Sequence, residues 1–261
     1  MKVMGIVNVT PDSFSDGGEF LDAGRAIAHG RELIEAGADV LDIGGESTRP
    51  GAEAVPVEEE LRRIVPVVEG LSGIVPISID TAKAPVAAAA IDRGASIVND
   101  VTGLRGDERM APLCAEREVE VVLMHMLGTP RTMQNDPSYD DVVAEVRDFL
   151  LERTELAVAA GIGREKIWID PGIGFGKTLD HNLALLAATA ELAATGLPVL
   201  VGPSRKAFIG KIDGAAEGNR LGGTIAACLQ AFAGGAAMVR VHDVAPVVQA
   251  IRVAEAIADT R

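Results

Sequence analysis

Eight short apolar segments recur along the chain and constrain its fold more than any other feature. They span residues 3–9, 39–44, 75–80, 96–101, 119–125, 166–170, 198–202 and 238–242. Their apolar residues run almost without interruption, which is typical of parallel strands buried on both faces. With helices between them, eight strands in 261 residues indicate a (β/α)8 TIM barrel. We predict one such domain over residues 1–261, with its active site at the C-terminal ends of the strands.

Helical patterns fill the intervals between these segments. Two of them carry an apolar face, with Val142, Val146, Phe149, Leu150, Leu156 and Ala160 expected inside in one and Val244, Val247, Val248, Ile251 and Ile257 in the other. Ser138 and Asp141 are typical of a helix N-terminal capping pair. Four helices are expected to end in a left-handed glycine, at Gly37, Gly94, Gly161 and Gly196.

An open doubly wound sheet is the alternative fold. That fold usually opens with a GxGxxG turn after the first strand. Here the first strand leads into NVTPDSFSDGG at residues 8–18, which has no such pattern. The barrel is therefore the preferred prediction.

Charge and cysteine content exclude several classes of partner. The chain has 24 Lys and Arg against 38 Asp and Glu, a net charge of −14, whereas nucleic acids and anionic membranes require a basic face. No targeting segment is visible, and no apolar run approaches the roughly 20 residues of a membrane span. Cys114 and Cys228 lack zinc or redox spacing. These features favour a cytoplasmic protein with reduced cysteines.

Polar residues collect where the predicted strands end. In chain order these residues are Asn8, Asp42, Glu46, Ser47, Thr48, Arg49, Asp80, Thr81, Asn99, Asp100, His125, Asp170, Ser204, Arg205, Lys206, Arg240, His242 and Asp243. The opposite ends, such as Pro76 and Pro198, offer little chemistry. This asymmetry predicts a site at the mouth of the barrel.

The cations of this set predict an anion site. Bidentate arginines together with a lysine and a histidine suit a phosphate or pyrophosphate, and the candidates are Arg49, Arg205, Lys206, Arg240 and His242. Asn8 and the carboxylates are suited to Mg²⁺, which prefers oxygen ligands and shares them with substrate phosphates.

The acidic residues predict a heterocycle. Asp80 and Asp170 end apolar strands, where an unpaired charge is costly. A flat ring with adjacent N–H donors, such as a 2-aminopyrimidinone, satisfies a carboxylate bidentately. Asn99 can pair with other ring nitrogens, and Lys206 can donate to the ring carbonyl or a ring nitrogen.

Each residue taken singly also has an ordinary structural explanation. Asn8 and Asp170 fit turn residues, and Asp80 fits a helix N-cap. Arg49 and Lys206 fit solvated surface charges, and His242 fits a structural histidine. His29 and His181 are expected on helix surfaces. GIGFGKT at residues 172–178 is one residue short of a P-loop, so we interpret it as a glycine-rich loop after the sixth strand.

Taken together, the motifs resemble those of the dihydropteroate synthases over the whole chain. They are NVTPDSFSDGG (8–18), GGESTRPGA (44–52), SIDT (78–81), NDVTG (99–103), LMH (123–125), DPGIGFGKT (170–178), SRK (204–206) and RVHD (240–243). The resemblance implies that p-aminobenzoate displaces pyrophosphate from 6-hydroxymethyl-7,8-dihydropterin diphosphate to give 7,8-dihydropteroate. It also implies Mg²⁺ as cofactor, a homodimer, and sulfonamides as competitors of p-aminobenzoate.

The resemblance implies a role for each motif residue. The implied pterin pocket comprises Asp80, Asn99, Asp170, Lys206 and Gly202, with Arg240 stacking on the ring and reaching the phosphates. Asn8, Arg49 and His242 would hold the pyrophosphate and its Mg²⁺. The implied p-aminobenzoate site comprises Phe14, Thr48, Pro50, Phe175 and Ser204. Segment 8–18 would act as a lid, with Asp16 ordering its closed form or the metal.

We expect a dissociative reaction, in which Asp80 and Asp170 oppose the positive charge that develops on the pterin methylene. Associative displacement by the same residues is the alternative mechanism. A pterin-binding methyltransferase and an inactive pterin-binding paralogue are the alternative functions. The cations of the STRP, SRK and RVHD motifs favour the synthase. Pro203 departs from the family pattern and removes one N–H near the expected p-aminobenzoate carboxylate.

Overall fold

The computed structural model describes residues 1–10, 19–49 and 51–260. Its eight parallel strands are β1 (Lys2–Asn8), β2 (Val40–Gly44), β3 (Ile77–Asp80), β4 (Ala95–Asp100), β5 (Glu120–Met124), β6 (Ile167–Asp170), β7 (Leu200–Val201) and β8 (Met238–Val241). They pair in the order β6-β5-β4-β3-β2-β1-β8-β7. A single bridge between Ile169 and Val199 joins the two outer strands. The sheet therefore closes on itself, and the predicted (β/α)8 TIM barrel is confirmed.

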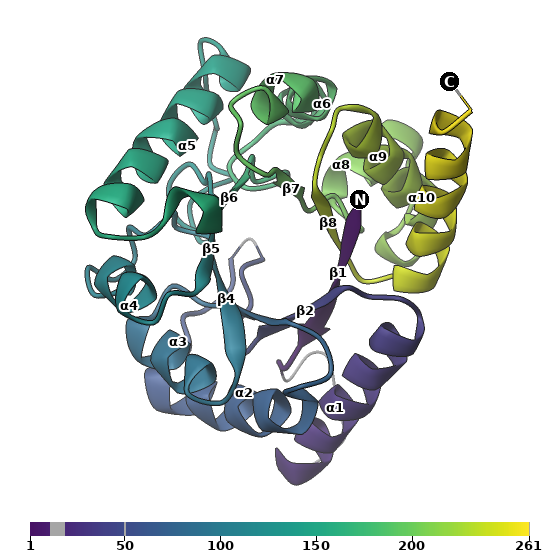
Figure 1. The fold of residues 1–261 in the computed structure, drawn as a ribbon. Helices are drawn as coiled ribbons and strands as arrows, with labels where there is room; N and C mark the ends of the chain where they lie inside the picture. Colours follow the sequence, from purple (N-terminus) through teal and green to yellow (C-terminus); the bar gives the residue numbers. More distant parts are fainter. Residues whose placement is uncertain (11–18, 50, 261) are drawn as a thin grey trace.

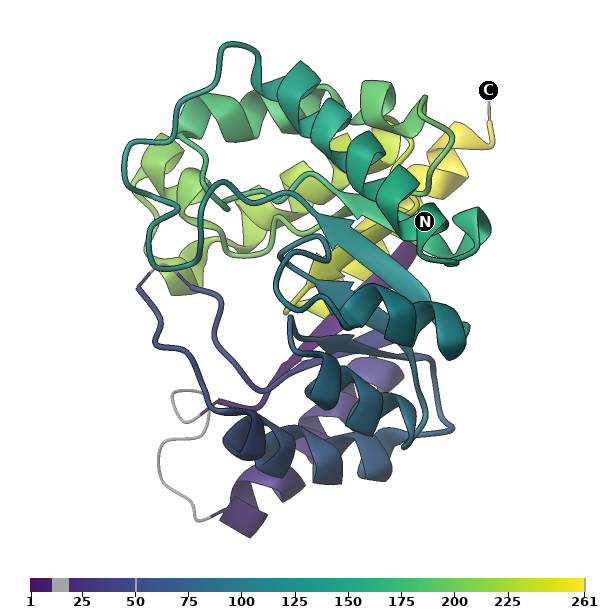
Figure 2. The same cartoon turned by 90° about the vertical axis from the view of Figure 1, so that its left-hand side faces the viewer.

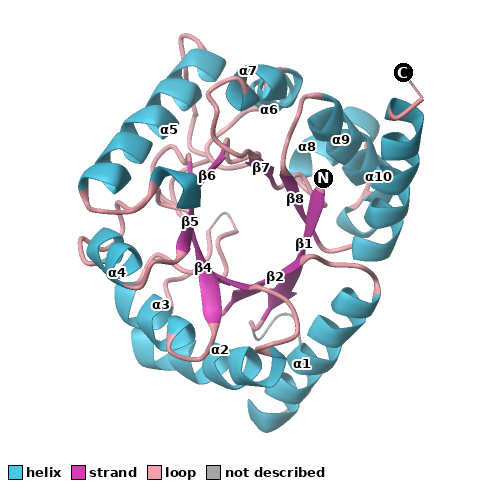
Figure 3. Ribbon diagram, viewed as in Figure 1, coloured by secondary structure: helices cyan, strands magenta, loops and turns pink. Residues whose placement is uncertain are grey.

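Helices form a ring outside the strands (Figures 1 and 3). They are α1 (Glu19–Glu35), α2 (Val57–Leu71), α3 (Ala84–Ile91), α4 (Met110–Glu116), α5 (Val142–Ala159), α6 (Leu179–Ala187), α7 (Thr189–Ala193), α8 (Ala207–Asp213), α9 (Leu221–Ala233) and α10 (Val244–Ala258), with short 3-10 turns η2 (Arg164–Lys166) and η3 (Glu217–Asn219). Their apolar faces pack on the outside of the barrel and form the largest core cluster. None of the helices in the described ranges has the length and apolarity that crossing a membrane requires.

The N-terminal end of the barrel interior is filled with apolar side chains. Seven strands each contribute one residue to this layer: Met4, Val40, Ile97, Val122, Trp168, Leu200 and Met238. The indole N–H of Trp168 donates to Glu120 at 2.5 Å. With this end closed, the polar ends of the strands open only on the other side, where the long loops gather at the left of Figure 2.

Strand register brings the polar residues to one level. Asn8 lies opposite Gly44, Gly44 opposite Asp80, and Asp80 opposite Asn99. Because paired residues of parallel strands point to the same face, Asn8, Asp80 and Asn99 project together into the barrel.

All four predicted helix-ending glycines have the left-handed backbone, with φ of 99° at Gly37, 106° at Gly94, 102° at Gly161 and 80° at Gly196. The predicted capping pair is wrong, because the side chain of Asp141 itself caps α5 by accepting from the N–H groups of Val143 and Ala144. Three positions expected inside are also exposed: Leu156, Ala160 and Ile257. They lie near the helix ends, where the predicted apolar face no longer points toward the barrel.

Candidate active site

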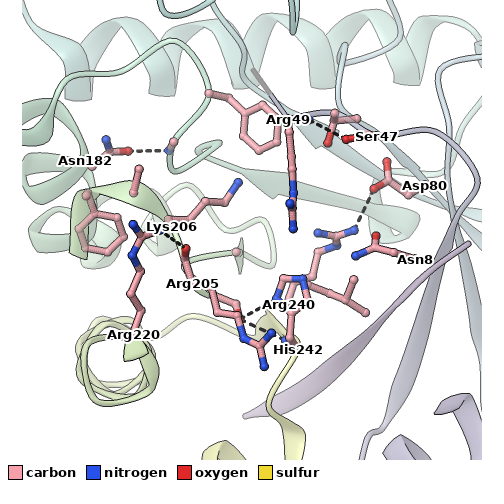
Figure 4. Close-up of a pocket in the computed structure, with 18 of the residues that line it drawn as sticks. Asn8, Ser47, Arg49, Asp80, Asn182, Arg205, Lys206, Arg220, Arg240 and His242 are labelled. Carbon is pink, nitrogen blue, oxygen red and sulfur yellow. Dashed lines mark hydrogen bonds and ion pairs between the residues drawn. The ribbon is translucent and has the colours of Figure 1, made fainter. Parts of the chain in front are cut away.

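A cavity of about 970 Å³ lies at the C-terminal mouth of the barrel. Its lining includes ten of the predicted site residues: Asn8, Thr48, Arg49, Asp80, Phe175, Gly202, Ser204, Lys206, Arg240 and His242. They come from β1, β3, β8 and the loops after β2, β6, β7 and β8, and they converge on one space (Figure 4). This volume is at the upper end of the range for small-molecule sites. Phe14, Asp16 and Pro50, also predicted for the site, lie outside the described residues.

Arg240 joins two buried carboxylates in the interior of the barrel. Its Nε donates to Asp42 at 2.5 Å, and its Nη2 donates to Asp80 at 2.8 Å. The amide of Asn99 donates to the same Asp42 oxygen at 3.1 Å. Four strands thus share one network of charged and polar side chains beneath the cavity.

Two carboxylate oxygens of this network are buried without a hydrogen-bond partner among the described residues, Oδ1 of Asp42 and Oδ1 of Asp80. Burial raises the pKa of Asp80 to about 7, against the effect of Arg240, and Asp42 raises it further. A buried unpaired acceptor is costly, so Oδ1 of Asp80 is suited to a ligand that brings N–H donors.

Asp170 is buried and Lys206 is half-buried, and their opposite charges interact. Asp170 accepts from the N–H of Gly172 at 2.7 Å, and burial raises its pKa to about 6 despite that bond. Lys206 carries its ammonium 4.0 Å from the centre of the Phe175 ring. Burial lowers the pKa of Lys206 to about 8, and Arg240 adds to this shift while Asp170 opposes it. The ring face stabilises the cation at this distance, and the ammonium can still donate to a ligand in the cavity.

His242 differs from its predicted role as a cation. Its Nδ1 lies 3.0 Å from the hydroxyl of Ser204, which also accepts from the His242 backbone N–H at 3.1 Å. Burial lowers the pKa of His242 to about 3, and Arg240 and Arg205 lower it further. The imidazole is therefore neutral near pH 7 and offers hydrogen bonds without a charge.

Arg205 lines the cavity with the other predicted cations, and Asp243 engages its guanidinium. Its guanidinium forms a bidentate pair with Asp243, at 2.9 and 2.6 Å. Its backbone is left-handed, with φ of 56°, and its carbonyl accepts from Arg220 at 2.9 Å. Ser204, Arg205 and Lys206 all line the cavity, and the Arg205 guanidinium is engaged there by Asp243.

The strand-end residue Asp100 and the helix residue His181 stabilise the local fold. Asp100 accepts from the N–H groups of Thr102 and Leu104 and from the Thr102 hydroxyl, so it shapes the turn after β4. His181, expected only on a helix surface, completes the cap of α6 by accepting from the Thr178 N–H at 3.3 Å.

Asp42 and Lys177 also organise the site, although the sequence predicts no specific role for them. Asp42 appears among the strand ends but received no role, although it anchors Arg240. Lys177 is 2% exposed, and its ammonium donates to the Phe175 carbonyl at 2.9 Å and lies 3.0 Å from Nδ1 of His125. It thereby fixes the loop that carries Phe175. The only signal for Lys177 was its place in the glycine-rich loop 172–178, whose length argued against a nucleotide site.

The family model of pterin binding enzymes matches residues 4–242 of this chain. The dihydropteroate synthase of Synechocystis sp. is 47% identical, with 98% of this chain and 89% of that protein covered. The dihydropteroate synthase of Escherichia coli K12 is 48% identical, with 97% and 90% covered.

Solved structures show the same similarity. Xanthomonas albilineans dihydropteroate synthase with 4-aminobenzoic acid superimposes with a TM-score of 0.93 at 52% identity, covering 98% of this chain and 93% of that one. The X. albilineans synthase in complex with 7,8-dihydropteroate gives a TM-score of 0.89 at 48% identity, with 98% and 93% covered.

Proposed function

The chain belongs to the dihydropteroate synthases, a family of pterin-binding enzymes. We propose that separate groups of residues at the mouth of its barrel bind the two substrates. The reaction condenses p-aminobenzoate with 6-hydroxymethyl-7,8-dihydropterin diphosphate, giving 7,8-dihydropteroate and pyrophosphate in folate biosynthesis. The single observation that carries the assignment is the buried Oδ1 of Asp80, which has no hydrogen-bond partner in the described part of the chain and lies beneath a cavity whose rim is cationic. A ring rich in N–H donors that bears an anionic leaving group matches both features.

The proposed pterin pocket lies in the depth of the barrel. Asp80 and Asp170 accept ring N–H groups, Asn99 meets the remaining ring nitrogens, and Lys206 donates to the ring carbonyl or a ring nitrogen. Gly202 lines the cavity, where the nearest atom to an added Cβ would be Cβ of Arg240 at 3.9 Å. A larger side chain there would take up space in the cavity next to the Arg240 side chain, whose guanidinium we propose stacks on the ring.

The proposed diphosphate site comprises Asn8, Arg49, Arg240 and His242. Arg49 is exposed at the rim, and Arg240 reaches the cavity from below. Arginine donors in a fork match the geometry of phosphate oxygens. Neutral His242 would contribute a hydrogen bond, and the two guanidiniums would carry the positive charge.

Mg²⁺ fits this site as a companion of the diphosphate. No cluster of three or more His, Cys, Asp or Glu side chains suited to a metal ion occurs within the described ranges. Asn8 lines the cavity and can offer one amide oxygen. That donor set suits a cation that keeps water ligands and binds mainly to substrate phosphates. When bound there, the ion would neutralise charge on the leaving pyrophosphate.

The proposed p-aminobenzoate site lies nearer the rim. Thr48, Ser204 and Phe175 line the cavity there, and by family resemblance Phe14 and Pro50 complete the site. Pro203 offers no N–H beside it, so the hydroxyl of Ser204 remains as a local donor to the substrate carboxylate.

The proposed reaction needs no nucleophilic side chain. The bond between the pterin methylene and the diphosphate oxygen breaks with its electron pair leaving on pyrophosphate. The lone pair of the arylamine forms the new carbon–nitrogen bond, and one amine proton is then lost. Ionised Asp80 and Asp170 would stabilise the positive charge on the pterin in a dissociative pathway.

We further propose a cytoplasmic homodimer that sulfonamides inhibit in competition with p-aminobenzoate. Cys114 and Cys228 are both buried and free, which agrees with a reducing compartment. Light scattering of the purified protein measures the oligomeric state directly.

Substitution of two cavity cations tests the site. Lys206→Ala and Arg49→Ala are expected to abolish turnover while leaving the circular dichroism spectrum of the parent. Turnover at the parental rate in both variants would overturn the assignment of these residues. Because a methyltransferase needs no diphosphate clamp, loss of activity in Arg49→Ala also separates the synthase from that alternative.

A further inference from the structure

Lys83 lies between two glutamates that come from different parts of the barrel mouth. Its ammonium donates to Oε2 of Glu46, in the loop after β2, and to Oε2 of Glu60 on α2 at 2.5 Å. Lys83 itself precedes α3, three residues after Asp80. One cation therefore joins the loop after β2, the helix that follows it and the loop after β3.

Glu46 joins the two ends of the loop that carries Thr48 and Arg49. Its Oε1 accepts from the N–H of Val55 at 3.2 Å, so one carboxylate links two residues that stand nine positions apart. Lys83 holds the other oxygen of the same carboxylate. Fixing both ends of a loop reduces the conformational freedom of the residues between them.

The start of this loop is also packed on α2. The carbonyl of Gly45 accepts from Arg63 at 2.8 Å. A Cβ added at Gly45 would lie 2.7 Å from Ile64 and 3.0 Å from Glu60, so the backbone lies directly on the helix. The position of Glu46 is thus set on one side by α2 and on the other by Lys83.

The charges explain why a cation is needed at this point. Glu60 is fully buried, and its Oε1 has no hydrogen-bond partner among the described residues. Glu46 and Glu60 face the same ammonium, so without it two carboxylates would repel each other. Burial alone would lower the pKa of Lys83, but the hydrogen bonds to Glu46 and Glu60 outweigh burial and raise it, so the lysine stays charged.

We propose that Lys83 is a positioning residue for the p-aminobenzoate site, acting through Glu46 to hold Thr48 and Arg49 over the cavity. This inference rests on the proposed function, which assigns those two residues to the substrates. Lys83 touches neither substrate in this account. Its larger effect is on the affinity of the loop for p-aminobenzoate, with a smaller effect on the diphosphate through Arg49, while the pterin pocket below keeps its own network.

Four single variants separate this role from a general effect on the fold. Lys83→Met removes the cation, Glu46→Ala removes the link to the loop, and Glu60→Gln removes the buried charge on α2 but keeps an acceptor. Arg93→Met is the matched control, because Arg93 also joins the α3 segment to a glutamate of α2, Glu69, at 2.8 Å, but at the far end of the helix pair.

We expect Lys83→Met and Glu46→Ala each to raise KM for p-aminobenzoate about tenfold, the scale of one lost charged hydrogen bond. KM for the pterin diphosphate should rise less, about threefold, because Arg49 shares the diphosphate with Arg240, and kcat should change about twofold or less, on the scale of a surface interaction. Glu60→Gln and Arg93→Met should leave KM for p-aminobenzoate within the same narrow range. The double variant Lys83→Met/Glu46→Ala should be no worse than either single variant, because both act through one contact.

Thr48→Ala distinguishes failure of this inference from failure of the proposed site. If Thr48→Ala raises KM for p-aminobenzoate but Lys83→Met and Glu46→Ala do not, Lys83 has no positioning role. If none of the three changes that KM, the assignment of the loop to p-aminobenzoate is wrong. Lys83 would have only a structural role if Lys83→Met and Arg93→Met changed KM for p-aminobenzoate equally. The same conclusion would follow if Lys83→Met raised KM for p-aminobenzoate and KM for the pterin diphosphate by the same factor.

Discussion

Asp42 holds Arg240 in place, with Oδ2 of the buried carboxylate 2.5 Å from Nε of the guanidinium. The two residues stand 198 positions apart in the chain, yet β1 alone separates their strands in the sheet. The same Asp42 oxygen accepts from Asn99. One carboxylate therefore orients two of the side chains proposed to contact the pterin.

Asp42→Asn should weaken binding of the pterin diphosphate, because an amide cannot balance the charge of Arg240 or accept equally from two donors. We expect kcat/KM for that substrate to fall by roughly tenfold to a hundredfold, on the scale of one to two charged hydrogen bonds. Asp39→Asn is the control, because Asp39 lies just before β2 at the opposite end of the barrel and accepts from Val3. Equal kinetics for Asp42→Asn and Asp39→Asn would contradict the role of Asp42.

The pH dependence of kcat/KM for the pterin diphosphate should be bell-shaped. Asp80 and Asp170 accept N–H groups only when ionised, and their pKa values of about 7 and 6 make activity fall as the pH drops below about 7. Lys206, with a pKa of about 8, donates a charged hydrogen bond only while protonated, so activity should also fall above about 8.

A steady-state profile from pH 5 to 10, in roughly half-unit steps, measures both limbs. In Lys206→Arg the alkaline limb should move to higher pH in whatever activity remains, since a guanidinium stays charged. An unchanged alkaline limb in that variant would mean that another group titrates there.

Asp80→Asn should make the unliganded protein more stable at high pH. The folded pKa of Asp80, about 7, lies above the ordinary value of 3.8, so the folded state binds the proton more tightly than the unfolded chain. Ionisation of Asp80 therefore costs folding free energy as the pH rises from about 4 to 7. Asn removes that cost, and the difference in Tm from the parent should grow between pH 5 and pH 8. A difference in Tm that shrinks with rising pH would contradict this account.

Removal of divalent cations should weaken binding of the diphosphate substrate more than that of p-aminobenzoate. In calorimetric titrations of the parent protein, EDTA should lower affinity for the pterin diphosphate, and added Mg²⁺ should restore it. Asn8→Ala should require more Mg²⁺ for the same affinity, because one amide oxygen is lost. Identical titrations with EDTA and with Mg²⁺ would exclude the proposed metal.

Gly172→Ala should destabilise the fold and the loop that carries Phe175. Gly172 has φ of 67°, and an added Cβ would lie 2.0 Å from the carbonyl oxygen of His125, which is backbone and cannot yield cheaply. We expect a loss of more than about 2 kcal/mol in the free energy of unfolding. Gly196→Ala, with φ of 80° but no atom within 4 Å, isolates the backbone cost and should lose about 1 kcal/mol. Equal losses in the two variants would show that the contact with His125 has no effect.

The barrel was predictable because its signal is local and repeated. Each strand shows as an apolar run, and each polar strand end falls on the same face of the barrel once the strands are parallel. For this reason Asn8, Asp80 and Arg240 were placed together correctly from widely separated positions in the chain. The left-handed glycines at helix ends were equally local, and they are confirmed.

Several features of the site depend on contacts that a sequence does not show. Arg205 lines the cavity as predicted, but its guanidinium is paired with Asp243. The charge of His242 depends on burial next to Arg240. The link from Glu46 through Lys83 to Glu60 joins three separate segments. Such contacts follow from packing between elements, which no local pattern encodes.

The most direct test of the central claim is release of pyrophosphate from dihydropterin diphosphate and Mg²⁺, measured with and without p-aminobenzoate. Release should depend on p-aminobenzoate, with one dihydropteroate formed for each pyrophosphate released. Tight binding of the pterin diphosphate with no release under either condition would contradict that claim, and would identify a pterin-binding protein without synthase activity.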